Sequence, residues 1–226
     1  MPDHSEQLAV NPAPIEDEQK VGEVEVATAD VGGEPVALRL SADVWVRIMQ
    51  HLSYASIRNV GAVCKKLQRI TKYEELDFLL FRQKPAKKLP HSLKLEIHPL
   101  LEAAQCTHLS TKEAPIYATS GDGEHGFLEL NAFDYPAVDE YSTQPACTTM
   151  EISVNVGKKV MVTDKNGIRN RRVLKALAKF WQQKSYGGQE TWLERLGDHQ
   201  FFEGWQSARV RENDQAVDLV ARWFGS

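Results

Sequence analysis

Between residues 40 and 52 a large apolar side chain recurs at every fourth position, at Leu40, Val44, Ile48 and Leu52. This spacing predicts an α-helix with the four side chains on one face, and Ser41 is a suitable residue to cap its start. Trp45 and Met49 form a second apolar stripe beside the first. A one-sided surface helix needs only one such stripe. The sequence therefore predicts a helix with more apolar surface than its own fold requires.

Two further short helices are predicted after it. Ser53 and Ser56 interrupt the first helix, and a second one carries Ile57, Val60 and Val63. A third runs from Cys64 to about Lys72, with basic residues on its outer side. Three short helices within about 35 residues build only a tiny core, and units of that size rarely stand alone. The surplus apolar surface indicates a partner interface or a neighbouring domain.

The order and spacing of these residues resemble the F-box. The positions that fit the family pattern are Leu40, Asp43, Val44, Ile48, Met49, Leu52, Ile57, Val63, Cys64, Lys65, Leu67 and Ile70. Three positions depart from it: Ser41 replaces the usual Pro, Trp45 replaces Leu, and Ser56 stands where an acid is common. Pro and Ser both suit a helix start, so the first change is tolerable.

The resemblance implies a three-helix F-box module over residues 38–83 that binds a Skp-family adaptor of a cullin ubiquitin ligase. The residues expected to bind the adaptor are Leu40, Val44, Trp45, Ile48, Leu52, Ile57, Val63 and Cys64. In that function the chain is a non-catalytic substrate receptor, because the cullin and RING subunits recruit the conjugating enzyme. The alternative is a scaffold protein that binds a Skp-family adaptor without a cullin.

Residues 1–35 contain nine acidic residues and one base, Lys20, with no aromatic residue. Such a segment cannot bury enough apolar surface to offset its loss of conformational entropy. We expect a disordered acidic leader, either a solvated segment or an interaction tail. Residues 84–94 are basic and contain Pro85 and Pro90, which predicts a linker and leaves a nuclear import signal as the alternative.

Residues 95–226 are predicted to form a mixed α+β domain. Met150, Ile152 and Val154 alternate with polar residues, as in a half-buried strand, and Gly157 begins a turn toward a second strand. Apolar residues at helical spacing predict a helix from about Val173 to Trp181. The same spacing from Ala216 to Trp223 predicts a C-terminal helix. Four of the five tryptophans follow residue 180, which favours an aromatic core over a ligand cage.

This part of the chain also resembles a domain of uncharacterised function found in many fungal proteins. The resemblance depends on residues 98–101, 144–149 and 173–177, and on the ending from Val217 to Gly225. It implies a fold and no specific activity. The domain is expected to recognise a substrate or another interaction partner.

A basic cluster marks the start of the helix at about residue 170. Arg169, Arg171 and Arg172 are candidate substrate-binding residues, because guanidinium groups pair bidentately with carboxylates and phosphates. The alternative is a solvated face of the helix.

Other motifs favour neither catalysis nor a cofactor. Residues 121–126 match the Gly-x-Gly-x-x-Gly pattern, but Asp122 and Glu124 would repel a pyrophosphate, so an exposed loop is favoured. His98, Cys106 and His108 fit no common zinc spacing. The sequence predicts no catalytic residue, no metal and no cofactor.

Charge and cysteine usage set the expected environment. The net charge of −4 gives no reason to expect nucleic acid as a partner. No apolar run approaches the roughly 20 residues of a membrane helix, and no signal-peptide pattern begins the chain. Cys64, Cys106 and Cys147 form an odd and sparse set, which suits a reducing compartment. We expect a cytosolic or nuclear protein.

Overall fold

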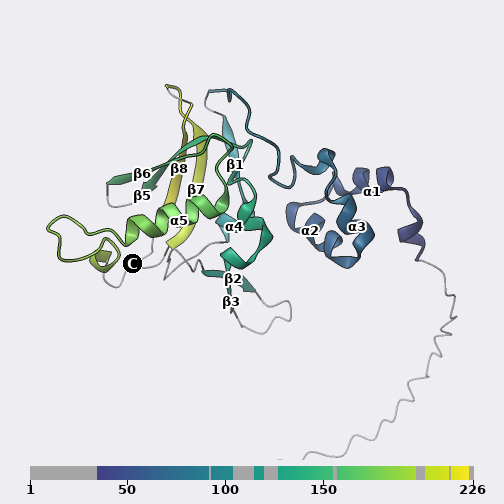
Figure 1. Ribbon diagram of the computed structural model, residues 1–226, viewed down its shortest axis with the longest axis horizontal. Helices are drawn as coiled ribbons and strands as arrows, with labels where there is room; N and C mark the ends of the chain where they lie inside the picture. The colour runs from purple at the N-terminus through teal and green to yellow at the C-terminus, as the bar shows by residue number, and fades with distance from the viewer. Residues whose placement is uncertain are drawn as a thin grey trace, which may run out of the picture.

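A computed structural model of the 226-residue chain describes residues 35–91, 93–103, 115–119, 127–154, 157–196, 202–213 and 215–223. A small helical module lies beside a larger domain built on a mixed sheet (Figure 1). The architecture is α+β, as the sequence predicts. The expected leader, residues 1–35, lies outside the described residues except for Pro35.

The helical module, residues 36–83, contains three α-helices between two short 3-10 helices. In chain order these are η1 (Val36–Arg39), α1 (Ala42–Met49), α2 (Tyr54–Val63), α3 (Lys65–Ile70) and η2 (Glu74–Leu76). The side chains of Ser41 and Ser53 accept hydrogen bonds from backbone N–H groups of the first turns of α1 and α2, as N-cap residues do. The three predicted helices are confirmed. Their core consists of Val46, Met49, Ile57, Leu67, Ile70, Leu76 and Leu80.

The basic linker predicted at residues 84–94 lies against the larger domain. Leu89 is buried in that domain's core, and its backbone N–H donates to Gln215 Oε1 at 2.8 Å. Gly167 adopts a φ of +99°, and a Cβ atom there would overlap the ring of Tyr141 and lie 2.8 Å from Pro85 Cγ. The connection is therefore anchored at Pro85 and Leu89, while its lysines at positions 84, 87 and 88 are exposed, and its last residue, Lys94, already begins a strand.

The C-terminal domain, residues 94–223, is organised around a six-stranded sheet with the order β4-β1-β7-β8-β5-β6. Its strands are β1 (Lys94–Ile97), β4 (Thr143–Gln144), β5 (Thr149–Val154), β6 (Lys158–Thr163), β7 (Phe202–Val210) and β8 (Val217–Trp223). Only the β5–β8 pair is parallel. A separate hairpin is formed by β2 (Pro115–Thr119) and β3 (Phe127–Asn131).

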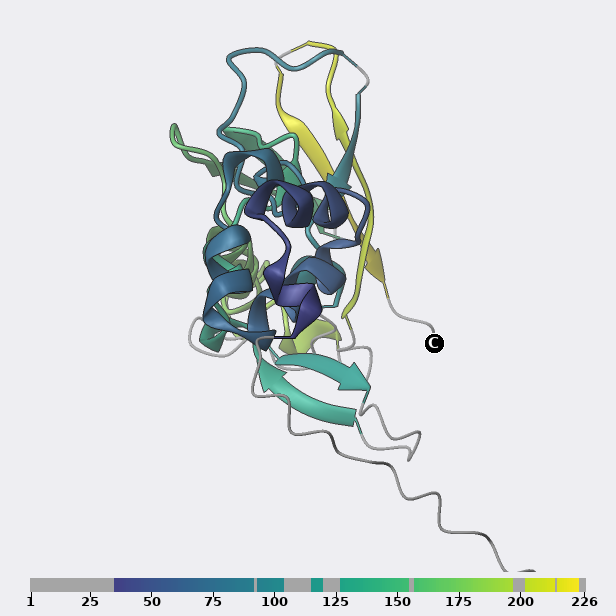
Figure 2. The same cartoon turned by 90° about the vertical axis from the view of Figure 1, so that its right-hand side faces the viewer.

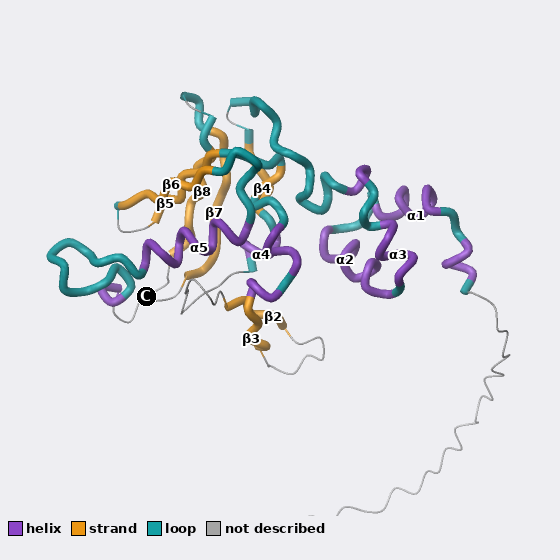
Figure 3. Tube along the Cα trace, in the orientation of Figure 1, coloured by secondary structure: helices purple, strands orange, loops and turns teal. Residues whose placement is uncertain are grey.

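The long helix α5 (Asn170–Trp181) crosses the sheet, as Figure 3 shows. It buries Val173, Leu174, Leu177 and Trp181, the residues from which the helix was predicted. Met150, Ile152 and Val162 of the predicted β5–β6 hairpin belong to the same core. Short helical segments complete the domain: α4 (Pro99–Glu102), η3 (Ala132–Asp134), η4 (Pro136–Asp139) and η5 (Glu194–Leu196).

The predicted aromatic core is confirmed for three of the four late tryptophans. Trp181, Trp192 and Trp205 are all less than 9% exposed, and the ring of Phe180 stacks on that of Trp192 at a centroid distance of 5.8 Å. These rings pack among core side chains. They are therefore structural residues, as favoured from the sequence.

The predicted C-terminal helix is wrong. Residues 217–223 form β8, which lies between β7 and β5 in the sheet. Val217 and Leu219 are fully buried and alternate with half-buried neighbours, which is the period of a strand. Over so short a segment the apolar residues also fit a helical spacing, and pairing with two neighbouring strands decides between the two.

Candidate adaptor-binding face and interdomain junction

Helix α1 carries one buried and one exposed apolar stripe. Val46 and Met49 pack in the core of the helical module, at 6% and 0% exposure. Val44 and Ile48 lie one turn apart and remain 41% and 39% exposed. η1 and α1 lie on the side of the module that is turned away from the sheet (Figures 1 and 2). The helix therefore presents the surplus apolar surface that its sequence predicts.

The residues expected to bind an adaptor fall into three groups by burial. Leu40, Val44, Ile48 and Val63 are exposed, at 37%, 41%, 39% and 71%. Trp45, Leu52 and Cys64 are half-buried against the core of the module. Ile57 is fully buried in that core, so it can affect adaptor binding only through the packing of the module. Adaptor contact itself stays a prediction for all of them.

Trp45, one of the three departures from the family pattern, joins η1 to α1. Its indole Nε1–H donates to the carbonyl oxygen of Ala37 at 3.1 Å. Lys66 of α3 holds the same segment, because its ammonium group donates to the carbonyl oxygen of Leu38. These bonds hold Leu40 at the start of α1, beside the exposed stripe.

On the opposite side of the module, the carboxylate of Glu140 joins the two parts of the chain. Its Oε2 accepts a hydrogen bond from the Tyr54 hydroxyl at 2.6 Å and lies 3.1 Å from His98 Nε2. Its Oε1 lies 3.3 Å from Arg58 Nη1. Tyr54 and Arg58 belong to α2, whereas His98 and Glu140 belong to the C-terminal domain. We call these four residues the Glu140 junction.

The hydrogen bonds of His98 fix its protonation state. Its Nδ1 accepts a hydrogen bond from the backbone N–H of Leu100 at 2.9 Å, so the ring proton lies on Nε2 and is donated to Glu140. The side chain is completely buried. This burial lowers the pKa of His98 below its ordinary value, although Glu140 acts in the opposite direction. The imidazole is therefore a neutral structural donor.

The junction keeps the Tyr54 hydroxyl neutral and the Glu140 carboxyl ionised. Burial, followed by the hydrogen bond to Glu140, raises the pKa of Tyr54, so its hydroxyl remains a donor. Burial would also raise the pKa of Glu140, but hydrogen bonds from His98 and Tyr54 and the charge of Arg58 bring it below its usual range. The junction is thus a carboxylate surrounded by three donors.

Phe81 is the point at which the helical module meets this network. Its ring packs edge-on against Tyr54 and His98, with centroid distances of 6.0 and 4.7 Å. Its carbonyl oxygen accepts a hydrogen bond from the backbone N–H of Tyr141 at 2.8 Å. Phe81 has a φ of +52°, which is uncommon for a bulky residue and persists only where the surroundings enforce it.

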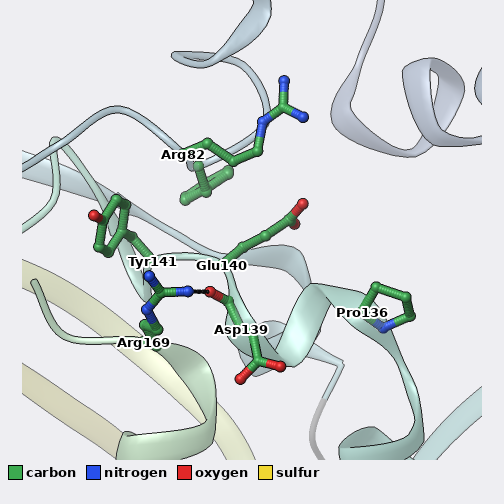
Figure 4. Close-up of a pocket in the computed structure, with 7 residues that line it drawn as sticks. Arg82, Pro136, Asp139, Glu140, Tyr141 and Arg169 are labelled. Carbon is green, nitrogen blue, oxygen red and sulfur yellow. Dashed lines mark hydrogen bonds between the residues drawn. The ribbon is translucent and has the colours of Figure 1, made fainter. Parts of the chain in front are cut away.

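A small cavity of about 210 Å³ lies beside the junction, between Arg82 on one side and Asp139 and Arg169 on the other (Figure 4). Its charged groups are already engaged. Arg169 Nη1 donates to the backbone carbonyl of Asp139 at 2.5 Å, and Arg82 Nη2 donates to the carbonyl of Thr71 and pairs with Asp77. The cavity therefore offers no free acid and base for proton transfer.

The three arginines at the start of α5 do not converge on one point. Arg171 forms two hydrogen bonds with the carboxylate of Asp139, at 2.8 and 3.1 Å, and holds the pKa of that carboxyl below its usual range. Arg172 instead pairs with Asp164 at 2.9 Å. A phosphate or carboxylate ligand would have to displace these partners. Their predicted role in substrate binding remains a hypothesis.

Other sequence motifs contribute nothing to a described site. Residues 121–126, Cys106 and His108 lie outside the described residues, and His98 is used by Glu140. The described segments contain no cluster of His, Cys, Asp or Glu that could hold a metal ion. In those segments no helix is long and apolar enough to span a membrane.

Sequence reasoning missed Tyr54, Arg58, Phe81 and Glu140. Glu140 lies 86 positions from Tyr54 and 82 from Arg58, so no local spacing reveals the contact. The available signal was weaker: a carboxylate between Val138 and Tyr141 in a segment rich in apolar residues needs a partner if that segment is buried.

Comparison with known proteins supports the assignment of the helical module. Neither the curated proteins nor the solved structures include a match to this chain. The predicted resemblance of residues 95–226 to a fungal domain therefore stays a prediction. The family model of the F-box domain matches residues 37–79. This span begins within η1 and contains the three helices and η2 of the helical module, with its buried and exposed apolar stripes. The chain therefore carries an F-box domain at its helical module.

Proposed function

We propose that this protein is the substrate receptor of a Skp–cullin–F-box ubiquitin ligase. An F-box domain supports binding of a Skp-family adaptor within such a ligase. The proposal adds that the exposed stripe of α1 makes this contact and that the C-terminal domain presents a protein substrate. F-box proteins are generally non-catalytic, and we propose the same for this chain.

The exposed apolar stripe is the observation that carries the proposal. Val44 and Ile48 lie on one face of α1, and Leu40 precedes them by one turn. Apolar side chains at this density on a small module cost free energy in water unless a partner covers them. Seven buried side chains form the described core of the module, which leaves little apolar area to stabilise it without a partner.

The Glu140 junction supports the role in presentation. Ubiquitin transfer depends on holding a substrate lysine near the conjugated ubiquitin, which is a positioning effect. A receptor whose two parts are joined by a linker anchored at Leu89 and by a buried carboxylate would maintain one orientation between adaptor and substrate. A flexible tether would lower that effective concentration.

The decisive experiment is co-purification with a Skp-family adaptor and a cullin. The intact chain should recover both, and a variant with Val44→Asp and Ile48→Asp should recover neither. Met161→Asp is the matched control, because Met161 is an exposed apolar residue of the C-terminal domain. Recovery of the adaptor without any cullin would instead establish the scaffold function, and recovery of neither partner by the intact chain would contradict both.

We also propose the cytosol or nucleus as the compartment. Cys64 and Cys147 are free thiols among the described residues, which supports a reducing environment. Burial raises the pKa of Cys147 to about 11, so this thiol is unreactive in the folded chain.

A further inference from the structure

A groove lies between the helical module and the part of the C-terminal sheet formed by β1 and β7. Its lining consists of residues 52–54, Leu79 and Phe81 of the helical module, residues of β1 and α4, and residues 205–208 of β7. The volume is about 640 Å³. Ligand sites in proteins typically measure about 300–1,000 Å³, so the groove has room for several side chains of a partner.

The groove forms where two strands separate. β1 and β7 pair only at Lys94–Arg209 and Leu95–Ala208. Beyond this point β1 pairs with β4 on its other side, and the register of β7 against β8 becomes irregular between Trp205 and Ser207. The next residues of both strands therefore border the groove instead of completing a ladder. Irregular strand ends of this kind are common beside binding sites.

The lining combines aromatic rings with uncompensated negative charge. Tyr54 is half-buried in the lining, whereas Phe81 and Trp205 are only 5% and 6% exposed there. Glu96 and Glu102 are exposed at the rim, and neither forms an ion pair within the described part of the chain. Lys94 is the single basic residue of the lining. Two carboxylates against one ammonium group give the groove a net negative charge, next to surfaces that attract apolar groups and cations.

We propose that this groove binds a short segment of a protein partner in which a lysine or arginine stands between apolar side chains. The inference rests on the proposed function, because it names the class of substrate segment that the receptor would recognise. The basic group pairs with Glu96 and Glu102, and its apolar neighbours contact the half-buried lining residues Tyr54, Leu79 and Pro99. Charge complementarity excludes acidic segments, including the chain's own residues 1–35 with their nine acids.

The test measures binding of fluorescein-labelled, capped peptides to the full chain by fluorescence anisotropy. One set carries a single Arg or Lys between Leu and Phe. A second set is identical except that Glu replaces the base, and a third keeps the base but replaces Leu and Phe with Ser. Saturable binding of the first set, with at least about tenfold weaker binding of the other two, is the expected result.

Two double variants locate the binding. Glu96→Lys with Glu102→Lys should weaken the first set by at least about tenfold. Asp134→Lys with Glu190→Lys makes the same charge change at exposed residues outside the groove, and should change the affinity by less than about twofold. Glu96→Gln with Glu102→Gln replaces the first variant if its thermal unfolding differs from that of the intact chain.

The inference is overturned if no basic peptide saturates below about 1 mM, if the Glu peptides bind equally well, or if the groove variant binds like its control. Adaptor co-purification separates this failure from failure of the proposed function. Loss of peptide binding leaves the exposed stripe of α1 intact. Conversely, a chain that recovers no adaptor would still be expected to bind the basic peptides.

Discussion

Of the ten large apolar side chains that are exposed among the described residues, seven lie between residues 36 and 78 and three lie in the C-terminal domain. The F-box buries seven apolar residues in its core, whereas the core of the C-terminal domain contains twenty-five among the same described residues. The smaller part therefore exposes more of the side chains that it most needs to bury. The proposed adaptor contact would cover some of these side chains, and the larger domain buries more apolar residues in its own core.

The two parts also differ in how they use charge. In the C-terminal domain, Glu151 pairs with Lys159 and Arg211 on the sheet, and Asp139 pairs with Arg171. The exposed stripe of α1 is apolar, and neither Asp43 nor Arg47 beside it forms an ion pair within the described residues. Depletion of charge at the centre with charges near the rim is typical of protein interfaces. This difference agrees with the proposed contact between α1 and an adaptor.

The largest effect is expected from Leu174→Ala, a change in the core of the larger domain. Leu174 is completely buried between α5 and the sheet, so its truncation should lower the free energy of unfolding by about 2–5 kcal/mol. Ile48→Ala in the exposed stripe should cost less than about 1 kcal/mol. Thermal unfolding of both variants measures the contrast, and an equal loss for the two would remove the distinction between core and contact surface.

A second prediction concerns affinity for the adaptor, for which the exposed stripe of α1 should matter more than the core of the larger domain. Val44→Ala with Ile48→Ala should lower the affinity for a Skp-family adaptor by about two orders of magnitude, because interface energy is concentrated in a few apolar anchors. Leu174→Ala should leave the affinity of the folded chain within about twofold. Isothermal titration calorimetry with the purified adaptor gives both values. Undiminished affinity of the double variant would place the adaptor contact elsewhere.

The local spacing of apolar residues in the sequence predicts much of the fold, but it does not predict the Glu140 junction. The apolar spacing of Leu174 and Leu177 and the alternation of Met150 and Ile152 are local signals, and α5 and β5 followed them. The contact of Glu140 with Tyr54 is long-range and leaves no such pattern. A helix was wrongly predicted at β8 because its apolar residues also fit a helical spacing over this short segment. Pairing with β5 and β7, of which β5 is far away in the sequence, decides for a strand.

Sequence also fails to separate the two kinds of apolar residue in the F-box. Ile48 and Ile57 are chemically identical, and both occupy helical positions in the family pattern. One is 39% exposed and the other is fully buried. Periodicity shows that a stripe is apolar, but only the packing of α1, α2 and α3 shows whether it faces the core or a partner.

A third prediction breaks the connection between the two parts. Glu140→Gln removes the buried negative charge and directs an amide N–H₂ toward donors that now lack an acceptor. We expect a loss of about 2 kcal/mol in stability, the scale of hydrogen bonds to charged groups. Amide hydrogen exchange should increase in α2 and around His98, while exchange in α1 and the adaptor affinity remain close to those of the intact chain. Asp134→Asn is the matched control, and equal exchange in both variants would show that Glu140 does not join the parts.

The junction also predicts a loss of stability in acid. The pKa of His98 in the folded chain lies below the unfolded value of about 6.5, and the pKa of Glu140 lies below about 4.5, so the unfolded chain binds more protons in each case. The contribution of these two groups to the free energy of unfolding is therefore fully present well above pH 6.5. It should decrease as the pH falls through the titration of His98, and again below pH 4.5 as Glu140 is protonated. Unfolding temperatures from pH 8 to pH 3 measure both decreases. The His98→Gln variant should lack the first part, and an unchanged profile in that variant would assign it to other groups.

The smallest effect is expected at the arginines that begin α5. The side chains of Arg171 and Asp139 are 36% and 53% exposed, so solvent and salt weaken their pairing despite its two hydrogen bonds. A double-mutant cycle with Arg171→Gln and Asp139→Asn should give a coupling energy below about 1 kcal/mol. Lys179→Gln, an exposed residue of the same helix, controls for the change in charge. A coupling above about 2 kcal/mol would show that the pair fixes the start of α5.

A weak coupling would leave Arg171 available to exchange Asp139 for an acidic group of a substrate. The triple variant Arg169→Glu, Arg171→Glu and Arg172→Glu should then reduce substrate recovery while the adaptor remains bound.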